Sequence, residues 1–439
     1  MYLVYILWVR LVSSAIDVVL GEGRVLRVIG PARIDVISGT ILAVGSKFTS
    51  GASIVVHKYR SYGIKALSEV KLRVTLGEGS KIEEVKEGEV VDDWLKASEQ
   101  VLHICRRSPC KVLIAGPPDS GKSTFAAFVA NYLREAGMKV CVVEGDIGQE
   151  DVLVPTTIAL AEVSKPILWL RELEALKFRF VGCTSPQYCY SESIQAIKEL
   201  VDEAVKMGFN VIVVNTDGWV NTTLALEHKL SIVRWVRPDV IVTTSSELYS
   251  YFLRCLGKFA KIINIPKPTV VRERSKEERR ELRVAAYRRY LSKGKPRKVK
   301  LDSIGIIGAC SLCGEPLTKD DVKNLLKVPE NVLEKVVYSS RFGDTVFLVV
   351  KEPVELSASS SGLEKVFTIV ARDMVGSIVA ILGSDMREVG IGVILSVDIE
   401  SRELTILTPW DGEIRGLIVG KVRLTEEFEE MGKVIRCTL

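Results

Sequence analysis

The pattern of apolar and polar residues divides the chain into three regions, and the pattern of the first region is typical of β-strands. Between residues 22 and 90, short apolar runs such as RVLRVIG and ASIVVHKY are separated by Gly, Pro and Ser, and few segments have helical periodicity. Runs of this kind are typical of strands joined by turns. We therefore predict a small β-rich N-terminal domain over residues 1–94, followed by the helically spaced apolar residues of WLKASEQVLHICRR.

From residue 110 onward, apolar strands alternate with amphipathic helices such as SESIQAIKELVDEAVKMG. This alternation predicts an α/β fold, in which a parallel sheet has helices on both faces. We assign residues 95–300 to this domain. The predicted strands are KVLIAG (111–116), KVCVVEGD (139–146), FRFVGC (178–183), NVIVVNT (210–216), DVIVTTS (239–245) and KIINIP (261–266).

A residue pattern typical of strands begins again near residue 301 and is clearest in GVILSVDIESRELTILTP (392–409). It predicts a C-terminal β-rich domain over residues 301–439. Three domains agree with a length of 439 residues at about 150 residues per domain. The basic run KGKPRKVK (293–300) before it is either a contact for nucleic-acid backbone or a basic linker.

The first twenty residues, MYLVYILWVRLVSSAIDVVL, are apolar enough to raise the question of a targeting segment. Arg10 ends the first apolar run and Asp17 interrupts the second, so neither reaches the roughly 20 residues that a membrane-spanning helix needs. No basic segment precedes them, as one does in a secretory signal. We expect a first β-strand or an over-long gene start here, and no membrane association.

Charge and cysteine content narrow the functional classes. A net charge of +5 and a pI near 8.6 permit an anionic partner but are too small for a general nucleic-acid coat, so any basic site is local. Nine cysteines in 439 residues are too sparse for a disulfide scaffold, which favours a reducing compartment and a cytoplasmic location. Cys310 and Cys313 form one CxxC, with Cys105 and Cys110 as a loose second pair, and metal binding or a disulfide stays open for them.

A phosphate-binding loop is the strongest chemical signal. The segment GPPDSGKS (116–123) fits GxxxxGK[ST], an apolar strand enters it, and TFAAFVANYLREAG continues as a helix. Backbone N–H groups and the helix N-terminus of such a loop bind phosphate, while Lys122 reaches the terminal phosphates and the Ser123 hydroxyl ligates Mg²⁺. The predicted residues of this nucleoside triphosphate site are Gly116, Asp119, Ser120, Gly121, Lys122, Ser123 and Thr124.

Two further strand ends carry polar side chains. Asp146 and Gln149 follow VCVVEG at the carboxyl edge of the sheet, where ligands of open α/β folds bind. A carboxylate there holds the metal's water shell or accepts a proton from an attacking hydroxyl, although a loop cap is the simpler role. Thr184 and Ser185 in GCTSP offer hydroxyls to a substrate phosphate, but such a turn is more often only a turn.

Trp219, in NTDGWV, directly follows the apolar strand end and is ambiguous by itself. A tryptophan after a buried strand is commonly a rim residue of the core. At the carboxyl end of a phosphate-loop sheet, however, an indole also offers a stacking surface to a base. The run RERSKEERRELR is similarly ambiguous, because mixed charges at i, i+4 spacing often lie on a solvated helix face.

Taken together, GPPDSGKST, DIGQ, GCTSP, NTDGW and VVRERSKEERRELR occur here in an order and spacing that resemble one family. It is that of the polynucleotide 5′-hydroxyl kinases related to the kinase subunit of the eukaryotic pre-mRNA cleavage complex and to nucleolar Grc-type kinases. The archaeal single-chain members are the closest comparison. The resemblance implies flanking β-rich domains, of which the N-terminal one helps to hold the adenine. It also implies that ATP and Mg²⁺ are used to phosphorylate the free 5′-hydroxyl of RNA, and also of DNA.

The resemblance assigns roles to individual residues. It implies that Lys122 and Ser123 bind ATP and Mg²⁺, and that Asp146 binds the metal or acts as the base. The residues placed at the substrate end are Gln149, Thr184, Ser185, Trp219 as the clasp on the terminal nucleotide, and Arg283, while Arg274 and Arg279 fall on the lid arginines.

Departures from the family pattern leave alternatives open. Asp217 occupies a variable position of NTxGW, and Glu22 is only a candidate for adenine contact. Some family members bind ATP without kinase activity, so the alternatives are an ATP-bound scaffold for RNA-processing factors and a P-loop ATPase. Retention of Lys122, the DxGQ motif and the lid arginines favours the kinase.

Overall fold

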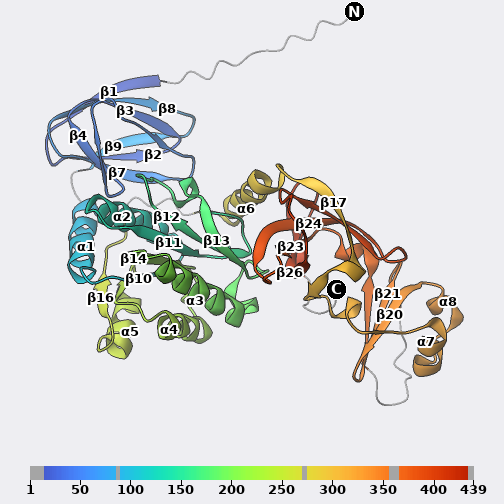
Figure 1. Cartoon of the computed structure of the whole chain (residues 1–439). Helices are drawn as coiled ribbons and strands as arrows, with labels where there is room; N and C mark the ends of the chain where they lie inside the picture. Colours follow the sequence, from blue (N-terminus) through green and yellow to red (C-terminus); the bar gives the residue numbers. More distant parts are fainter. Residues whose placement is uncertain (1–13, 86–88, 269–273, 355–364, 434–439) are drawn as a thin grey trace, which may run out of the picture. The chain divides into compact units, whose positions relative to one another are not determined.

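The computed structural model describes residues 14–85, 89–268, 274–354 and 365–433 (Figure 1). Most of the apolar start of the chain therefore lies outside the described residues, as do residues 269–273 of the predicted lid motif. The last seven residues of the apolar start form a strand, Ser14–Leu20, as one of the two expectations for this segment predicted. The chain divides into two compact units. The first contains the described residues up to Val143 together with Ala161–Glu174 and Val201–Ser275, and the second contains Glu144–Leu160, Ala175–Leu200 and the described residues from Lys276 onward. The predicted domains 1–94, 95–300 and 301–439 stay a prediction.

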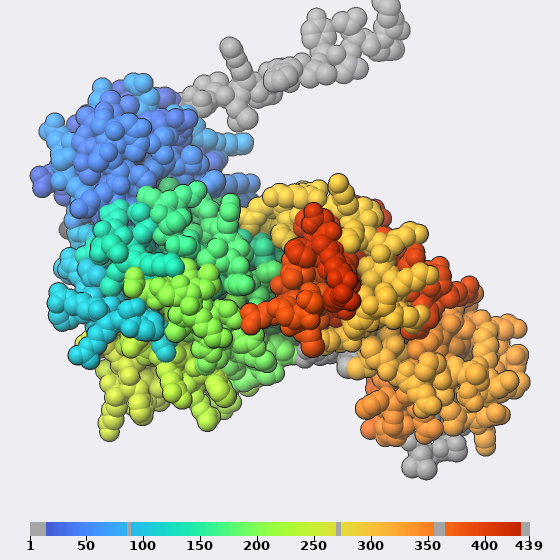
Figure 2. All heavy atoms as spheres, in the orientation of Figure 1, coloured from blue at the N-terminus to red at the C-terminus, as the bar shows by residue number. Residues whose placement is uncertain are grey.

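The first unit begins with two antiparallel sheets, of order β1-β8-β3-β6 and β5-β4-β7-β2-β9. Alternate residues of strands such as β7 and β8 are buried, as in sheets with one face on a core. These strands form the closely packed blue region of Figure 2 and confirm the predicted β-rich N-terminal region. They are β1 (Ser14–Leu20), β2 (Val25–Ile29), β3 (Ala32–Ser38), β4 (Thr40–Ala43), β5 (Ser46–Thr49), β6 (Ser53–Val56), β7 (Ser61–Ala66), β8 (Val70–Leu76) and β9 (Lys81–Val85).

The same unit holds a parallel sheet in which β11, β14, β10, β15 and β16 are successive neighbours. All residues of β14 and β15 are buried, as expected where both faces are covered. Helix α2 leads from β10 toward β11, and α4 leads from β14 in the opposite direction to β15. Because such crossovers are right-handed, α2 lies on one face and α4 and α5 on the other (Figure 1). The predicted α/β fold is confirmed.

The elements around this sheet are α1 (Val91–Ile104), β10 (Cys110–Ala115), α2 (Lys122–Glu135), β11 (Val140–Gly145), the short 3-10 helix η1 (Leu170–Glu172), β14 (Val211–Thr216), α4 (Thr223–Val236), β15 (Val240–Thr243), α5 (Ser246–Leu256) and β16 (Lys261–Asn264). Five of the six predicted strands therefore agree closely with the structure. The sixth, FRFVGC, starts and ends too late, because the strand here is β13 (Ala175–Phe180). Beyond it, Gly182 has a φ of +80 and its N–H donates to Thr156 O, as does that of Val181.

The second unit contains β12 and β13, helix α6 and the C-terminal sheets. One sheet has the order β17-β25-β24-β23-β26-β18, with β27 paired to β26, and another has the order β19-β20-β21-β22. The predicted β-rich segment 392–409 is most of the antiparallel pair of β24 and β25. The basic run 293–300 is not merely a linker, because six of its residues form β17, which pairs with β25. The predicted β-rich C-terminal region is confirmed.

The bounds of the remaining elements are β12 (Thr157–Glu162), β13, the 3-10 helix η2 (Pro186–Tyr188), α3 (Tyr190–Lys206), α6 (Lys276–Leu291), β17 (Lys295–Lys300), η3 (Leu301–Ser303), β18 (Gly305–Ile307), η4 (Cys310–Leu312), β19 (Glu315–Pro316), α7 (Lys319–Leu326), α8 (Glu330–Leu333), β20 (Val336–Phe342), β21 (Thr345–Val350), β22 (Lys365–Val370), η5 (Ala371–Met374), β23 (Ser377–Leu382), β24 (Glu388–Asp398), β25 (Glu403–Thr408), β26 (Gly416–Leu424) and β27 (Glu430–Lys433). None of the described helices combines the length and apolarity that a membrane crossing requires.

Candidate functional site

The predicted phosphate loop connects β10 to α2, which begins at Lys122. Lys122 is 6% exposed, and its Nζ donates to Pro117 O at 2.7 Å, so the ammonium lies folded over the loop. The Ser120 hydroxyl also donates to Pro117 O, and it lies 2.5 Å from Thr244 Oγ1 of the segment after β15. The loop is therefore fixed by contacts within the protein, and the reach of its lysine to terminal phosphates stays a prediction.

The end of β14 is joined to this loop by side-chain hydrogen bonds. Asn215 Nδ2 donates to Ser123 Oγ at 3.1 Å, and Thr216 Oγ1 donates to Ile114 O at 2.8 Å. Sequence reasoning missed Asn215, which is fully buried and orients the hydroxyl predicted to ligate Mg²⁺. A polar residue at the end of an otherwise apolar strand was the available signal, but only the pairing of β14 with β10 gives it a partner.

The NTDGW turn after β14 lies directly against the phosphate loop. A Cβ on Gly218 would be 2.8 Å from Pro118 N, so only glycine fits this approach. Trp219 is half-buried, its N–H donates to Asp217 Oδ1 at 2.8 Å, and its ring centroid is 5.7 Å from that of His228. The indole is thus not fully enclosed in the core, and part of its surface is open beside the turn. Contact with a terminal nucleotide stays a prediction.

In the second unit, the DIGQ segment forms a turn shaped by Asp146. Its Oδ1 accepts the N–H groups of Gly148 and Gln149 at 3.1 and 3.0 Å, so this carboxylate caps the loop. Capping by Oδ1 does not exclude the predicted metal or base role. A Cβ on Gly148 would be 2.7 Å from Thr184 O, so the loops that carry Asp146 and Thr184 are in close contact. The structure therefore brings the loops that carry Asp146, Gln149 and Thr184 together, although Thr184 lies four residues beyond the end of its strand, and their roles stay a prediction.

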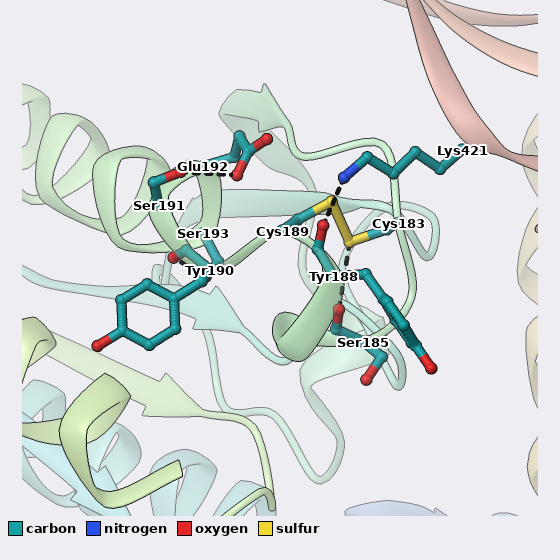
Figure 3. The surroundings of a disulfide bond; sticks show 9 residues. All are labelled: Cys183, Ser185, Tyr188, Cys189, Tyr190, Ser191, Glu192, Ser193 and Lys421. Carbon is teal, nitrogen blue, oxygen red and sulfur yellow. Dashed lines mark hydrogen bonds between the residues drawn. A yellow bond between two sulfur atoms is a disulfide. The ribbon is translucent and has the colours of Figure 1, made fainter. Parts of the chain in front are cut away.

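The GCTSP turn is closed by a disulfide between Cys183 and Cys189 (Figure 3). Thr184 and Ser185 lie within this small ring and are partly exposed, whereas both cysteines are buried. Lys421 of β26 holds the ring by donating its N–H to Gly182 O and its Nζ to Tyr188 O. The turn thus has more support than a simple surface loop, and the pairing of these two cysteines was not predicted from the sequence.

The predicted lid arginines fall in both units. The N–H of Arg274 donates to Asp119 Oδ2 at 3.4 Å, which places this residue beside the phosphate loop. Arg279 and Arg283 lie on α6, where Arg283 forms an ion pair with Glu430 at 2.8 Å. Their approach to ATP or substrate stays a prediction. Glu22, the adenine candidate, is exposed in the turn between β1 and β2.

A zinc site at the cysteines is not formed. Cys105 and Cys110 are joined by a disulfide, and Cys310 is disulfide-bonded while Cys313 is a free, exposed thiol. Among the described residues, no cluster of three or more His, Cys, Asp or Glu side chains could hold a metal ion. The sparse cysteines therefore do form disulfides, contrary to the expectation from their number. The oxygen donors at Ser123 and Asp146 are of the type that Mg²⁺ prefers.

Comparison with known proteins shows what this chain is similar to. The family model described as mRNA cleavage and polyadenylation factor CLP1 P-loop matches residues 116–293. A curated polyribonucleotide 5′-hydroxyl-kinase of Thermococcus kodakarensis is 29% identical over 353 residues, which cover 79% of this chain and 97% of the relative. These similarities bear out the resemblance that the sequence predicts.

Further polyribonucleotide 5′-hydroxyl-kinases are also similar to the chain. The polyribonucleotide 5′-hydroxyl-kinase of Methanocaldococcus jannaschii is 29% identical, over 75% of this chain and 91% of the relative. Human Clp1, also named a polyribonucleotide 5′-hydroxyl-kinase, is 24% identical, over 85% of each chain. The fold is also similar to that of a chain in the solved structure of a complex of Clp1p with Pcf11p. The TM-score is 0.67 and the sequence identity is 15%, and the match covers 94% of the present chain and 98% of the solved one. That likeness supports the fold.

Proposed function

We propose that the chain is an ATP-dependent polynucleotide kinase that transfers the γ-phosphoryl group of ATP to the free 5′-hydroxyl of RNA, and also of DNA. The observation that carries the proposal is similarity along nearly the whole length of curated polyribonucleotide 5′-hydroxyl-kinases, together with a formed phosphate loop that retains Lys122. The acceptor is the end of a strand. Recognition should therefore rest on stacking and sugar-phosphate contacts, with weak sequence preference.

The chemistry assigned to the residues follows from their positions. Transfer forms a bond between the 5′ oxygen and the γ-phosphorus and breaks the bond to the β,γ-bridging oxygen, so ADP leaves and the hydroxyl proton goes to a base. Lys122 would neutralise charge on the terminal phosphates, and Asp146 would accept the proton or support the metal. Bound through Ser123, with Asp146 as the other candidate ligand, Mg²⁺ would supply charge neutralisation to the β- and γ-phosphates.

The remaining predicted residues would act on the ends of the two substrates. Trp219 offers a stacking surface to the terminal base, while Gln149, Thr184 and Ser185 would contact the adjoining sugar-phosphate. Arg274, Arg279 and Arg283 would close over the phosphates or approach the strand, and arginines in this role contribute about 10³ to 10⁵ in rate. We place the enzyme in the cytoplasm.

Phosphoryl transfer to a labelled end tests the proposal directly. The purified protein is incubated with γ-labelled ATP, Mg²⁺ and a 5′-hydroxyl oligoribonucleotide, with the 5′-phosphorylated oligonucleotide as the matched control. Label should appear on the first oligonucleotide alone, and Lys122→Ala should lower the rate by at least about 10² to 10³, as loss of a transition-state contact does. Release of free phosphate alone would indicate an ATPase, and retained, unreacted ATP a scaffold.

A further inference from the structure

Two consecutive residues of α4, His228 and Lys229, are completely buried behind the turn that carries Trp219, each with 0% exposure. Lys229 Nζ donates to Asp217 Oδ2 at 2.6 Å, and Asp217 is itself 4% exposed. Removing both charges from water carries a large desolvation cost, so such a pair is weak evidence for a stabilising role. The position of this pair suggests another role.

Lys229 is the charge that keeps Asp217 ionised. Burial is the largest single influence and acts to raise the pKa of Asp217, but the adjacent Lys229 ammonium, His228 and the Trp219 N–H together leave the pKa below its ordinary value. The carboxylate is therefore a strong acceptor, with one oxygen toward Lys229 and the other toward the turn.

The second oxygen, Oδ1, accepts the N–H of Trp219 at 2.8 Å and so closes a turn across Gly218. On the other side, Gly218 is in close contact with Pro118 of the phosphate loop. The Trp219 ring lies against His228, the neighbour of Lys229 on α4, with an angle of 44° between the ring planes. The direction in which the indole leaves the backbone is thus set between the phosphate loop and this pair of α4 residues.

We propose that Asp217, held by Lys229, is a positioning residue that fixes the Trp219 indole relative to the phosphate loop for binding the polynucleotide end. The role rests on the proposed function for its substrate, although the placement of the indole does not. Both side chains are buried, with 4% of Asp217 and 0% of Lys229 exposed, so neither presents a surface to a substrate. Both act through Trp219, so their effect belongs to oligonucleotide binding and not to ATP binding.

Replacing Lys229 both in the wild type and in a Trp219→Ala variant distinguishes an effect that acts through Trp219 from a general loss of stability. Lys229→Met should raise the KM for a 5′-hydroxyl oligonucleotide by about 2- to 30-fold, the range for coupling through a supporting residue, and leave the KM for ATP unchanged. In a Trp219→Ala background, the same substitution should have no further effect on the oligonucleotide KM. An equal rise in both backgrounds would overturn the proposal, because the effect would then not pass through Trp219.

An uncharged buried substitution on the same helix is the matched control. Ile232 of α4 is also 0% exposed, so Ile232→Ala disturbs the helix packing without removing the ion pair. It should lower thermal stability and leave the oligonucleotide KM unchanged. If Ile232→Ala raises that KM as much as Lys229→Met does, the pair has no specific role.

Lys229→Met leaves the Asp217 carboxylate unpaired and could fail to fold for that reason. Two double variants in which both charges are removed then test the positioning role. Asp217→Asn with Lys229→Met retains an oxygen for the Trp219 N–H, whereas Asp217→Ala with Lys229→Met removes it. The first should keep the oligonucleotide KM close to that of the wild type, and the second should raise it. Equal KM values in the two doubles would contradict positioning through this hydrogen bond.

Tryptophan emission gives a readout that does not need activity. The Trp219 contribution is the difference between each protein and its Trp219→Phe counterpart, measured with an added quencher. In Lys229→Met, this contribution should become more accessible to the quencher than in the wild type, and unchanged accessibility would overturn the proposal. If the wild type transfers no label to an oligonucleotide, the proposed function fails while this measurement still tests the positioning.

Discussion

His228 is an imidazole enclosed next to a charged pair, and its environment favours the neutral form. Its pKa falls from 6.5 to about 4, chiefly because of burial and next because of the neighbouring Lys229 ammonium, while Asp217 partly opposes them. Between these two values the unfolded chain binds more protons than the folded chain. The stability that neutral His228 permits is therefore present above pH 6.5 and is lost as the pH falls toward 4.

Replacing His228 by a side chain that does not titrate should remove this pH dependence. We expect the wild type to lose about 2 to 3 kcal/mol of unfolding free energy between pH 7.5 and 4.5 through this residue, and His228→Gln to lose correspondingly less. Urea unfolding followed by tryptophan fluorescence at the two pH values measures the difference. Identical losses in both proteins would show that the folded imidazole titrates normally.

At this scale, the sequence predicts residues whose chemistry is written into a local motif. Lys122 and Ser123 follow from GxxxxGK[ST] alone, because strand, loop and helix are contiguous. Asn215 and Lys229 do not, since their partners Ser123 and Asp217 are supplied by a neighbouring strand and by a turn that precedes the helix. A buried lysine within the apolar face of α4 departs from the usual pattern, and its reason appears only with the turn in place.

At the scale of elements, α6 shows how a strongly charged helix is anchored by few apolar residues. Its buried positions are Leu282, Ala286, Tyr287 and Leu291, which recur at helical spacing within a mostly charged segment. Tyr287 is 0% exposed in a cluster with residues of β23 and β24, and its hydroxyl has no hydrogen-bond partner among the described residues. Burial, followed by the nearby Glu430, raises the pKa of Tyr287 well above its ordinary value.

Removing this hydroxyl should not weaken the packing of α6. Tyr287→Phe keeps the ring and removes an unsatisfied polar group. The unfolding free energy should therefore stay the same or rise, by at most about 3 kcal/mol. Tyr287→Ala, which also removes the ring, should lower it by about 3 to 5 kcal/mol. Chemical denaturation of the three proteins tests both changes. A clear loss of stability in Tyr287→Phe would mean that the hydroxyl has a bonded partner.

Helices and strands were predicted well where the apolar pattern was strong, and poorly where contacts with other parts of the fold determine whether a segment forms a strand. The sheet strands β10 and β14 were found within one residue at each end, because long apolar runs between turn residues are typical of buried parallel strands. Strand β12, TIALAE, was missed, since a short apolar run can belong to a strand or a helix. Strand β17 was hidden by its basic composition, which suits an edge strand with Val299 as its one buried residue.

At the scale of the whole molecule, each compact unit is assembled from separate stretches of the chain. The first unit takes up residues 161–174 and 201–275 after its N-terminal part, and the intervening stretches belong to the second. Composition and periodicity report local structure. They therefore indicated the order of β-rich and α/β regions along the chain, but not that segments of the two units alternate in the sequence. The phosphate loop and Trp219 lie in the first unit, and Asp146, Thr184 and Arg279 lie in the second.

Nucleotide binding should consequently stabilise the molecule through the first unit. A ligand that binds only the folded protein adds about 2.7 kcal/mol at a hundredfold excess over its Kd, which raises the Tm of a domain of 150 to 250 residues by roughly 5 to 10 °C. ATP with Mg²⁺ should therefore shift the thermal transition that includes the phosphate loop, and AMP, which lacks the β- and γ-phosphates, should shift it much less. In Lys122→Ala, the unliganded Tm should stay close to that of the wild type, because the Lys122 ammonium contacts a loop carbonyl and anchors no core. The ATP shift should shrink in this variant, and a full shift there would show that the nucleotide binds elsewhere than at the phosphate loop.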